Sequence, residues 1–234
     1  GERYLDFHAK ESRINFRSTH NLDNGAKLGT FIEMDFMLPV GGNERVSNSF
    51  TPRIRHAFVT YNNWLVGQTW MTFFNVGALP ENLDFVGPAE SSIFGRQPMI
   101  RYTAGSWQFA LENPETTITP YGGGGRIVSD DNTMPDAVVR YNLKGDWGSF
   151  TVAGLFRQLR YDNNAAINLA HIKDSTTGYG ISASGKFVFA NKHDFRWMVS
   201  SGKGMGRYIG LNTANGAVLD ADGNLHAKIG RAHV

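Results

Sequence analysis

Arginine is the residue type whose number and spacing in this sequence most clearly indicate a chemistry. The 234 residues contain 23 Lys and Arg against 21 Asp and Glu, and fifteen of those cations are arginine. The planar guanidinium binds a carboxylate through two parallel hydrogen bonds. A nearly balanced total charge gives no reason to expect a nucleic-acid partner. The sequence therefore favours small organic anions as ligands, provided that the arginines share one surface.

Cations greatly outnumber acids in the segments whose pattern is typical of strands. Three acids fall there, Glu33, Asp35 and Glu112, and the others are assigned to turns and loops. The thirteen cations are Arg13, Arg17, Lys27, Arg53, Arg55, Arg96, Arg101, Arg140, Lys144, Arg157, Arg160, Lys186 and Arg196. A narrow passage lined by one sign of charge concentrates ions of the opposite sign. We expect the anion-binding, pore-lining residues to be Arg13, Arg17, Arg53, Arg55, Arg101, Arg140, Arg157 and Arg196.

Most of these cations alternate with apolar residues and therefore lie on the opposite face of their strand. Arg53 and Arg55, for example, are expected on one face, with Ile54 and Phe58 on the other. A cation facing lipid near mid-membrane would cost roughly 2–4 kcal/mol, and the alternation avoids that cost. The pattern predicts apolar side chains toward lipid and guanidinium groups toward water.

Arg53 and Arg55 are the strongest candidates for gripping one carboxylate of a ligand, because we expect no acid on the neighbouring strand. Arg101 or Arg140 would then meet a second carboxylate. The alternative is a structural ladder in which Arg13 and Arg17 pair across a hairpin with Glu33 and Asp35.

The elements that position these arginines are β-strands, because apolar residues recur with period two and no helix is indicated. The longest unbroken apolar run has four residues, Phe187 to Ala190, and a membrane-spanning helix needs about 20. Ten strands are expected, over 12–19, 27–38, 50–61, 64–74, 97–104, 107–113, 137–144, 150–161, 178–189 and 195–201. The facing of 64–74 and of 150–161 is ambiguous.

The connections between these strands alternate in length. Short turns are expected near 20–26, 62–63, 104–106, 145–148 and 190–193, and long loops at 39–49, 75–95, 118–136, 162–176 and from about 202. This sorting is typical of an outer-membrane barrel, with periplasmic turns and extracellular loops, rather than of a Greek-key sandwich or an eight-stranded soluble barrel. The sequence predicts an all-β, transmembrane, antiparallel up-and-down β-barrel.

The segment 75–95 is expected to be the third extracellular loop. The first connection in the chain is a short turn, so residues 1–11 are the end of an earlier loop and one strand precedes them. The segment carries many apolar residues, which predicts a constriction loop packed inside the barrel mouth, with Glu81, Asp84 and Phe85 at the constriction. Glu81 and Asp84 either trim anion passage or pair with wall arginines. A loop that caps the rim or covers a neighbouring subunit is the alternative.

Six stretches of the sequence resemble the DcaP-like porins of Gram-negative outer membranes. They are Lys10–Arg17, Pro52–His56, Asn63–Trp70, Leu83–Pro88, Arg96–Thr103 and Gly202–Gly210. The resemblance implies a homotrimer of 16-stranded barrels, each a passive channel for small organic anions such as dicarboxylates, in contact with outer-membrane lipid. Because ten of the sixteen strands are expected in this sequence, the resemblance implies a fragment of a porin, truncated at both ends.

The last six residues, 229–234, match the translation of a common sequencing adaptor. We expect them to be an artefact and residues 1–228 to form the partial barrel. A natural tail is the alternative.

Enzymatic and metal chemistry find little support in the sequence. The absence of cysteine excludes disulfides and thiolate sites, and we expect no metal, cofactor or catalytic residue. Two alternatives to a channel are a lipase-like barrel enzyme that uses His56 and Ser49, and a soluble carbohydrate-binding β domain. The sequence around Ser49 does not have the nucleophile-elbow motif that the enzyme alternative would favour.

Overall fold

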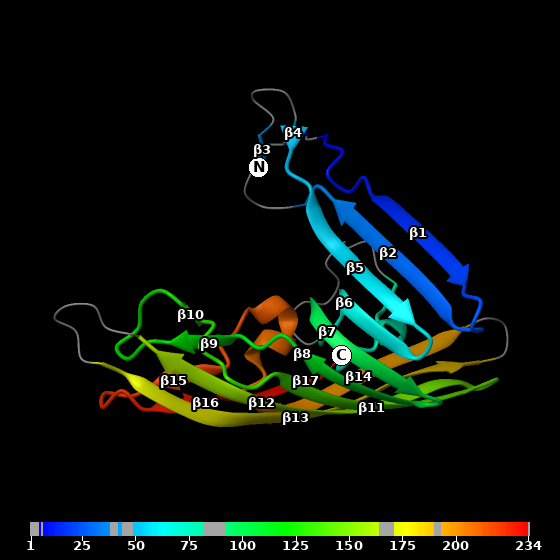
Figure 1. The fold of residues 1–234 in the computed structure, drawn as a ribbon. Helices are drawn as coiled ribbons and strands as arrows, with labels where there is room; N and C mark the ends of the chain where they lie inside the picture. Colours follow the sequence, from blue (N-terminus) through cyan, green and yellow to red (C-terminus); the bar gives the residue numbers. More distant parts are fainter. Residues whose placement is uncertain are drawn as a thin grey trace. The chain divides into compact units, whose positions relative to one another are not determined.

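The structure is a computed structural model that describes residue 5 and residues 7–37, 42–43, 49–81, 92–163, 171–189 and 193–233. Asp84 and Phe85 lie outside the described residues. The chain divides into two compact units, Gly1–Thr69 and Trp70–Val234, whose strands are labelled in Figure 1. Each unit is described by itself.

The first unit is built around antiparallel strands in the order β1-β2-β5-β6. Their bounds are β1 (Ile14–Asn21), β2 (Lys27–Asp35), β5 (Arg53–Tyr61) and β6 (Trp64–Trp70). A small hairpin pairs β3 (Gly42–Asn43) with β4 (Ser49–Phe50). Gly25, with φ of 79°, closes the turn between β1 and β2, as the Asp-Asn-Gly sequence predicts.

The second unit contains a sheet in the order β7-β8-β11-β12-β13-β14-β17, and every neighbouring pair is antiparallel. The strands are β7 (Arg96–Ala104), β8 (Trp107–Glu112), β11 (Asp136–Gly145), β12 (Gly148–Asp162), β13 (Lys173–Val188), β14 (Asp194–Lys203) and β17 (Ile229–His233). Residues 229–233 thus pair with β14, and their origin as an adaptor artefact stays a prediction.

Two segments expected to be plain loops form a second sheet, so that expectation was wrong. β9 (Thr116–Thr119), β10 (Ile127–Ser129), β15 (Ala217–Leu219) and β16 (Leu225–Ala227) pair in the order β10-β9-β15-β16. Ile118 and Leu219 of this sheet are buried with Leu159 of β12 in a separate apolar cluster. These strands have three or four residues each, too few for period-two alternation to be visible in the sequence.

The described residues contain three single-turn 3₁₀ helices, η1 (Val76–Ala78), η3 (Gly206–Tyr208) and η4 (Gly210–Asn212). None of the described helices has the length and apolar character needed to cross a membrane.

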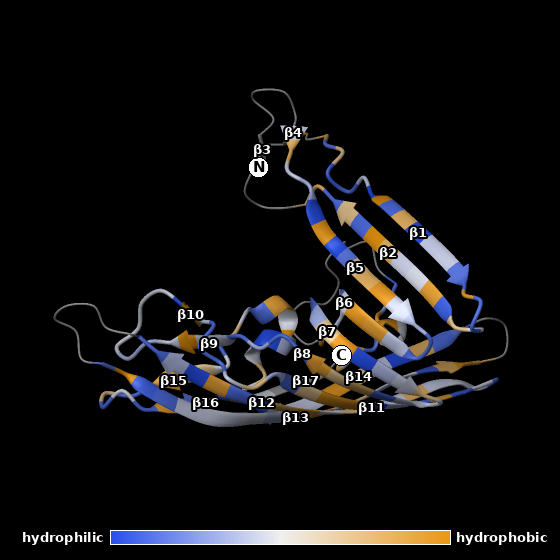
Figure 2. Cartoon of the chain, viewed as in Figure 1, coloured by the Kyte–Doolittle hydropathy of each residue, from blue (hydrophilic) through white to orange (hydrophobic). Residues whose placement is uncertain are grey.

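One face of the second unit's main sheet is apolar and exposed. Figure 2 shows hydrophobic and hydrophilic residues alternating along these strands, as expected of a sheet with one apolar face. The exposed residues of this outer face include Ile100, Phe109, Leu111, Val139, Phe156, Tyr179, Ile181 and Val199. Eight large apolar side chains facing solvent on a single sheet are far more than a water-soluble protein tolerates. This face is suited to contact with lipid.

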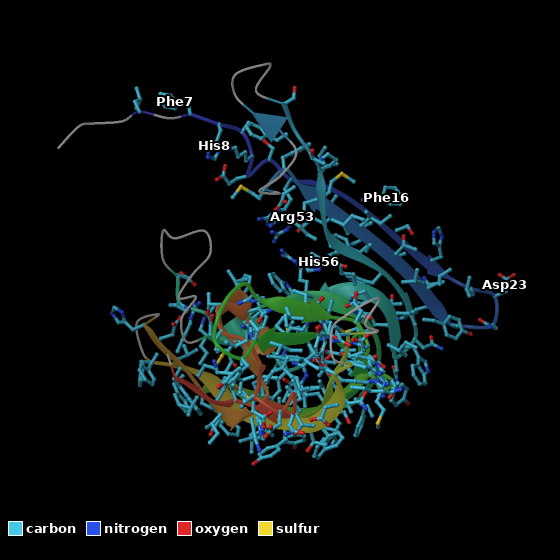
Figure 3. All side chains as sticks on the ribbon, turned by 90° about the vertical axis from the view of Figure 1, so that its left-hand side faces the viewer. Phe7, His8, Phe16, Asp23, Arg53 and His56 are labelled. Carbon is cyan, nitrogen blue, oxygen red and sulfur yellow. The ribbon has the colours of Figure 1, made fainter. Side chains whose placement is uncertain are left out.

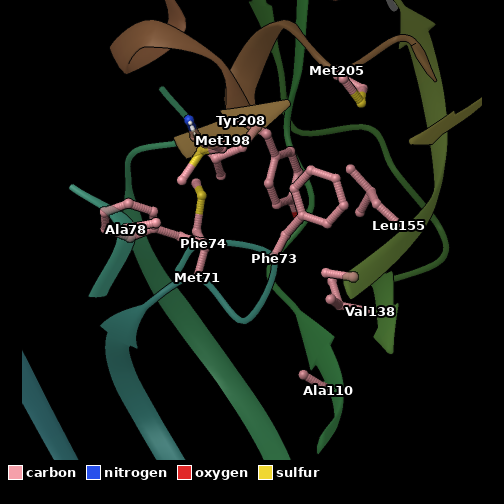
Figure 4. Packing of buried hydrophobic residues seen from close by; sticks show 12 residues of the cluster. Met71, Phe73, Phe74, Ala78, Ala110, Val138, Leu155, Met198, Met205 and Tyr208 are labelled. Carbon is pink, nitrogen blue, oxygen red and sulfur yellow. Dashed lines mark hydrogen bonds between the residues drawn. The ribbon is translucent and has the colours of Figure 1, made fainter. Parts of the chain in front are cut away.

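The opposite, inner face of that sheet is covered by two chain segments, 71–79 with 92–95, and 204–212. Phe73, Phe74, Ile93, Met205 and Tyr208 from these segments are buried against the strands (Figure 4). The wall side of this cluster is made by Ala110, Val138, Ala153, Leu155 and Met198. The backbones of the two segments are joined, because Phe94 N donates to Tyr208 O and Gly210 N donates to Ser92 O.

Each of the ten strands expected from the sequence overlaps a strand of the structure, but several bounds differ. β6 ends at Trp70, so residues 71–74 were wrongly assigned to a strand, while β13 begins at Lys173 rather than at 178. The inner face of β12 carries Thr151, Ala153, Leu155, Arg157 and Leu159, all buried. That arrangement resolves the ambiguous facing of 150–161, since Arg157 lies inward and Arg160 outward.

Candidate functional site

The charged face of the first unit is centred on four side chains that pair with one another. Arg53 donates to both oxygens of Asp35, with Nε–Oδ1 2.9 Å and Nη2–Oδ2 2.7 Å. Arg55 donates to Glu33 Oε1 at 2.7 Å and to Asp35 Oδ2 at 3.1 Å. The expectation that Arg53 and Arg55 have no acid on the neighbouring strand was therefore wrong. Strand β2 places both carboxylates beside them.

A β-bulge in β5 explains why the facing of Phe58 was also wrong. Glu33 pairs with His56 and Met34 pairs with Ile54, which leaves Arg55 as the extra residue. The bulge turns both Arg55 and His56 into the buried side of the sheet. Phe58, two residues further on, shares that face and contacts the Phe31 ring. In Figure 3, Arg53 and His56 project from one face and Phe16 from the other.

Arg13 and Arg17 do not form the alternative ladder with both acids. Arg13 Nε lies 3.8 Å from Glu33 Oε1, whereas the Arg17 guanidinium is stacked over the Phe31 ring at 4.8 Å. Arg17 contributes to a pocket of about 200 Å³ together with Gly29, Phe31, Phe58 and Thr60. Arg17 is exposed on this face, and it is one of the two predicted arginines whose side chains form no hydrogen bond or ion pair among the described residues. Arg13 is also exposed, at 40% of its side chain, but lies in ion-pair range of Glu33.

Arg101 is the other of these two arginines and lies on the inner face of the second unit. It lies on β7, where Ile100 is exposed on the outer face and Met99 is buried on the inner face. Because side chains alternate along a strand, Arg101 shares the inner face with Met99. Its side chain makes no hydrogen bond or ion pair among the described residues, and its electrostatic neighbours include Glu112. A half-buried guanidinium with free donors is the arrangement that an anion can use.

Arg140 is bound to the backbone of the inner segment rather than exposed to solute. Its Nη1 donates to Phe74 O at 2.7 Å and to Thr72 O at 3.4 Å. Its Nε donates to Asn142 Oδ1 at 2.7 Å.

Arg196 is bound to the same segment further along the chain. Its Nη1 donates to Leu79 O at 2.7 Å, and its Nη2 pairs with Glu81. Its Nε donates to Asp194 Oδ1 at 2.9 Å. Of the two roles left open for Glu81, the structure therefore shows pairing with a wall arginine.

Arg157 is the most buried of the predicted arginines and belongs to a polar network. Its Nε lies 3.3 Å from Asp136 Oδ1, and it donates to the carbonyls of Gly204 and Glu115. Its guanidinium also contacts the Tyr208 ring at 5.4 Å. With 1% of its surface exposed, Arg157 holds the inner segment 204–212 in place.

Tyr208 connects two buried carboxylates that the sequence pattern did not single out together. Its hydroxyl lies 3.0 Å from Asp136 Oδ2 and 3.2 Å from Glu112 Oε2, and it accepts from Gln97 Nε2 at 2.9 Å. Glu112 Oε1 also accepts from Thr72 N at 2.7 Å. Glu112 and Asp136 are direct partners on β8 and β11, so the network is set by strand register.

The count of three strand acids was wrong. Four further acids, Asp136, Asp162, Asp174 and Asp194, lie in strands because those strands extend beyond their apolar core. Three of them pair with strand cations: Asp136 with Arg157, Asp162 with Arg160 and Lys173, and Asp194 with Arg196 and Lys186. The cationic surplus is therefore smaller than the sequence count and is concentrated at a few positions.

Metal chemistry gains no support within the residues described. No group of three or more His, Asp and Glu side chains converges there on a metal position. The carboxylate of Asp220, which lies near Asp222 and Asn224, accepts from the backbone N–H groups of both and contacts His226 Nε2 at 2.8 Å. The His226 hydrogen bond in particular holds the pKa of Asp220 below its usual value. His56, the base of the enzyme alternative, has Nδ1 3.0 Å from Thr69 Oγ1.

Comparison with known proteins agrees with this architecture. Residues 2–220 match the family model described as DcaP outer membrane protein. The crystal structure of the outer membrane channel DcaP of Acinetobacter baumannii matches with a TM-score of 0.69 and 23% sequence identity. The match covers 90% of this chain and 56% of that one, so the chain spans little more than half of the neighbour's length. No curated protein matches the sequence.

Proposed function

The chain belongs to the DcaP outer membrane protein family of the Gram-negative outer membrane, and we propose that it acts as a passive channel for small organic anions, including dicarboxylates. The described strands form part of a closed barrel that assembles as a homotrimer, as the family resemblance implies. The proposal includes the segment 75–95 as the constriction loop. Catalysis has no part in it.

The observation that carries this proposal is the division of the sheet faces. Large apolar side chains are exposed on one face of the second unit's sheet, and Arg101, Arg140 and Arg196 lie on the other. Such a sheet is stable where lipid covers the first face and water or polar groups meet the second. A lumen lined by cations then favours anions.

Arg17 and Arg101 carry the anion preference in this account, because the other predicted arginines are held by acids or carbonyls. Arg53 and Arg55 are neutralised by Glu33 and Asp35. Arg101 has free donors among the described residues. Of the eight candidate residues, Arg17 and Arg101 are thus the two with guanidinium donors left for the solute.

The reversal potential of single channels in a KCl gradient tests the proposal. We expect chloride to permeate better than potassium. A unit charge about 4 Å from an ion's path contributes about 1 kcal/mol in a water-like dielectric, attractive for chloride and repulsive for potassium. Arg101→Gln should therefore lower chloride permeability about fivefold and raise potassium permeability by a similar factor.

The double variant Arg53→Gln/Asp35→Asn serves as the control, since it removes an arginine without changing the net charge. It should leave the selectivity close to wild type. Cation selectivity of the wild-type channel would contradict the proposal.

A further inference from the structure

We propose that Arg140 and Arg196 are positioning residues that hold the segment 71–81 on the inner wall and thereby set the size of the passage. They do not bind the permeating anion in this account. The inference rests on the proposed channel function for its meaning, but the docking of the segment can be measured without transport.

The first attachment point is Arg140, whose donors are directed at the start of the segment. Besides its bonds to the carbonyls of Thr72 and Phe74, its Nη2 lies 3.5 Å from Asn75 Oδ1. Asn142 Oδ1 accepts from Arg140 Nε and also from the Thr151 hydroxyl at 3.0 Å. The guanidinium is thus fixed from the wall side by two neighbouring strands, and its remaining donors meet the segment.

The second attachment point is Arg196, four residues or more further along the segment. It bonds to Leu79 O and Glu81 on the segment, and to Asp194 on its own strand. Asp194 Oδ2 also lies 3.0 Å from Lys186 Nζ of β13. The orientation of Arg196 is therefore fixed by the wall in the same manner as that of Arg140.

The segment between the two arginines is anchored to the wall and capped, with Asn75 and Ala78 buried. Asn75 Nδ2 donates to Ser184 Oγ of β13 at 3.0 Å, and Asn75 Oδ1 accepts from Gly77 N to cap η1. Ala78, at the end of η1, is 2% exposed. Apolar packing alone resists sliding poorly because it is not directional, whereas guanidinium bonds to fixed carbonyls specify one position.

Arg101 offers a matched comparison on the same face. It carries the same charge as Arg140, and the two guanidinium groups are close enough to interact electrostatically. Arg101 makes no hydrogen bond to the segment among the described residues. Both Arg101→Gln and Arg140→Gln therefore remove one positive charge. Arg140→Gln alone also removes hydrogen bonds to the segment.

The first experiment measures the size limit of the channel by exclusion of polyethylene glycols of increasing mass during single-channel recording. Arg140→Gln and Arg196→Gln should admit larger polymers and raise conductance severalfold, with an anion preference no lower than that of Arg101→Gln. Arg101→Gln should keep the wild-type size limit. An unchanged limit in both Arg140→Gln and Arg196→Gln would overturn the inference.

The second experiment reads the docking directly and does not depend on transport. The protein has no cysteine, so Ala78→Cys introduces a single buried thiol whose reaction with a water-soluble maleimide reports release of the segment. In the folded, detergent-solubilised protein, adding Arg140→Gln or Arg196→Gln should accelerate labelling at least tenfold. Adding Arg101→Gln should leave the rate unchanged.

Two results of this labelling experiment would overturn the inference: equal acceleration by Arg101→Gln, or no acceleration by either attachment variant. If the wild-type channel prefers cations but the attachment variants still speed labelling, the proposed selectivity fails and the positioning role stands.

Discussion

Replacing Arg157 with methionine should destabilise the folded protein by about 3–5 kcal/mol, the usual cost of leaving one member of a buried ion pair alone. Arg157 is 1% exposed, and its partner Asp136 is 0% exposed. Asp136 would retain only the Tyr208 hydroxyl, which must also serve Glu112. Glu112 keeps Thr72 N and Gln97 Nε2 as donors, so Asp136 is the carboxylate left without a cationic partner at hydrogen-bonding distance. The segment 204–212 would lose its bond from Arg157 to Gly204 as well.

Urea unfolding of the detergent-folded protein measures this effect. Arg160→Met is the matched control, because Arg160 lies on the same strand, is 24% exposed at its side chain and is paired with Asp162 at 3.8 Å. A partly exposed pair at this distance contributes about 0–1 kcal/mol. Equal unfolding midpoints for the two variants would show that the Arg157 network does not stabilise the fold.

Replacing Ile181 with arginine should cost about 2–4 kcal/mol if the outer face lies in lipid, because a cation at mid-membrane is poorly solvated. Ile181 is 59% exposed at the middle of β13. In water the same substitution on an exposed strand position would change stability by less than about 1 kcal/mol. The experiment therefore separates a lipid-facing sheet from a soluble one.

Thr177→Arg on the same face of β13 is the control. Opposite it on β12 is Gln158, and further out the paired residues are polar, including Arg160 with Ser175 and Asp162 with Lys173. The cost of arginine on a barrel falls toward the interface, so Thr177→Arg should be tolerated. Equal, small effects at positions 177 and 181 would contradict the lipid-facing assignment.

The sequence was sufficient to predict the faces of most strands. On β8 and β11, apolar residues occupy every second position for six to ten residues, and the placement of these side chains on one face follows directly from that period. The short turns were equally predictable where Asn and Gly adopt positive φ, as at Gly25 and Asn62. Strand faces and short turns depend on residues that are close together in the sequence, so the sequence pattern alone predicts them.

The sequence was insufficient where a contact depends on register between strands. The bulge at Arg55 shifts the pairing of β5 with β2 by one residue, and no local pattern marks it. That shift decides which acids meet Arg53 and Arg55. The bonds of Arg140 and Arg196 to backbone carbonyls are similarly invisible, because every residue in a loop offers the same acceptor.

Tyr208 is a buried network residue that was not among the candidates, although its sequence context indicates burial. It lies in the glycine-rich stretch Gly202–Gly210, which had been assigned to a loop after a strand. An aromatic residue with a polar hydroxyl in a stretch that contains four glycines indicates a segment that can approach other backbone closely and bury its ring. The structure bears this out, because Gly206 leaves no room for a Cβ against the backbone of residues 214–216.

Nitroxide scanning along β7 tests most directly whether lipid covers one face and water the other. Single cysteines at positions 100 to 103 of the cysteine-free chain would carry the label in bilayers, and collision with oxygen and with a water-soluble nickel chelate would be recorded. Labels at positions 100 and 102 should meet oxygen, and labels at 101 and 103 should meet nickel. Nickel contact at 100 and 102 with oxygen contact at 101 and 103, or no alternation at all, would contradict the assignment of the two faces.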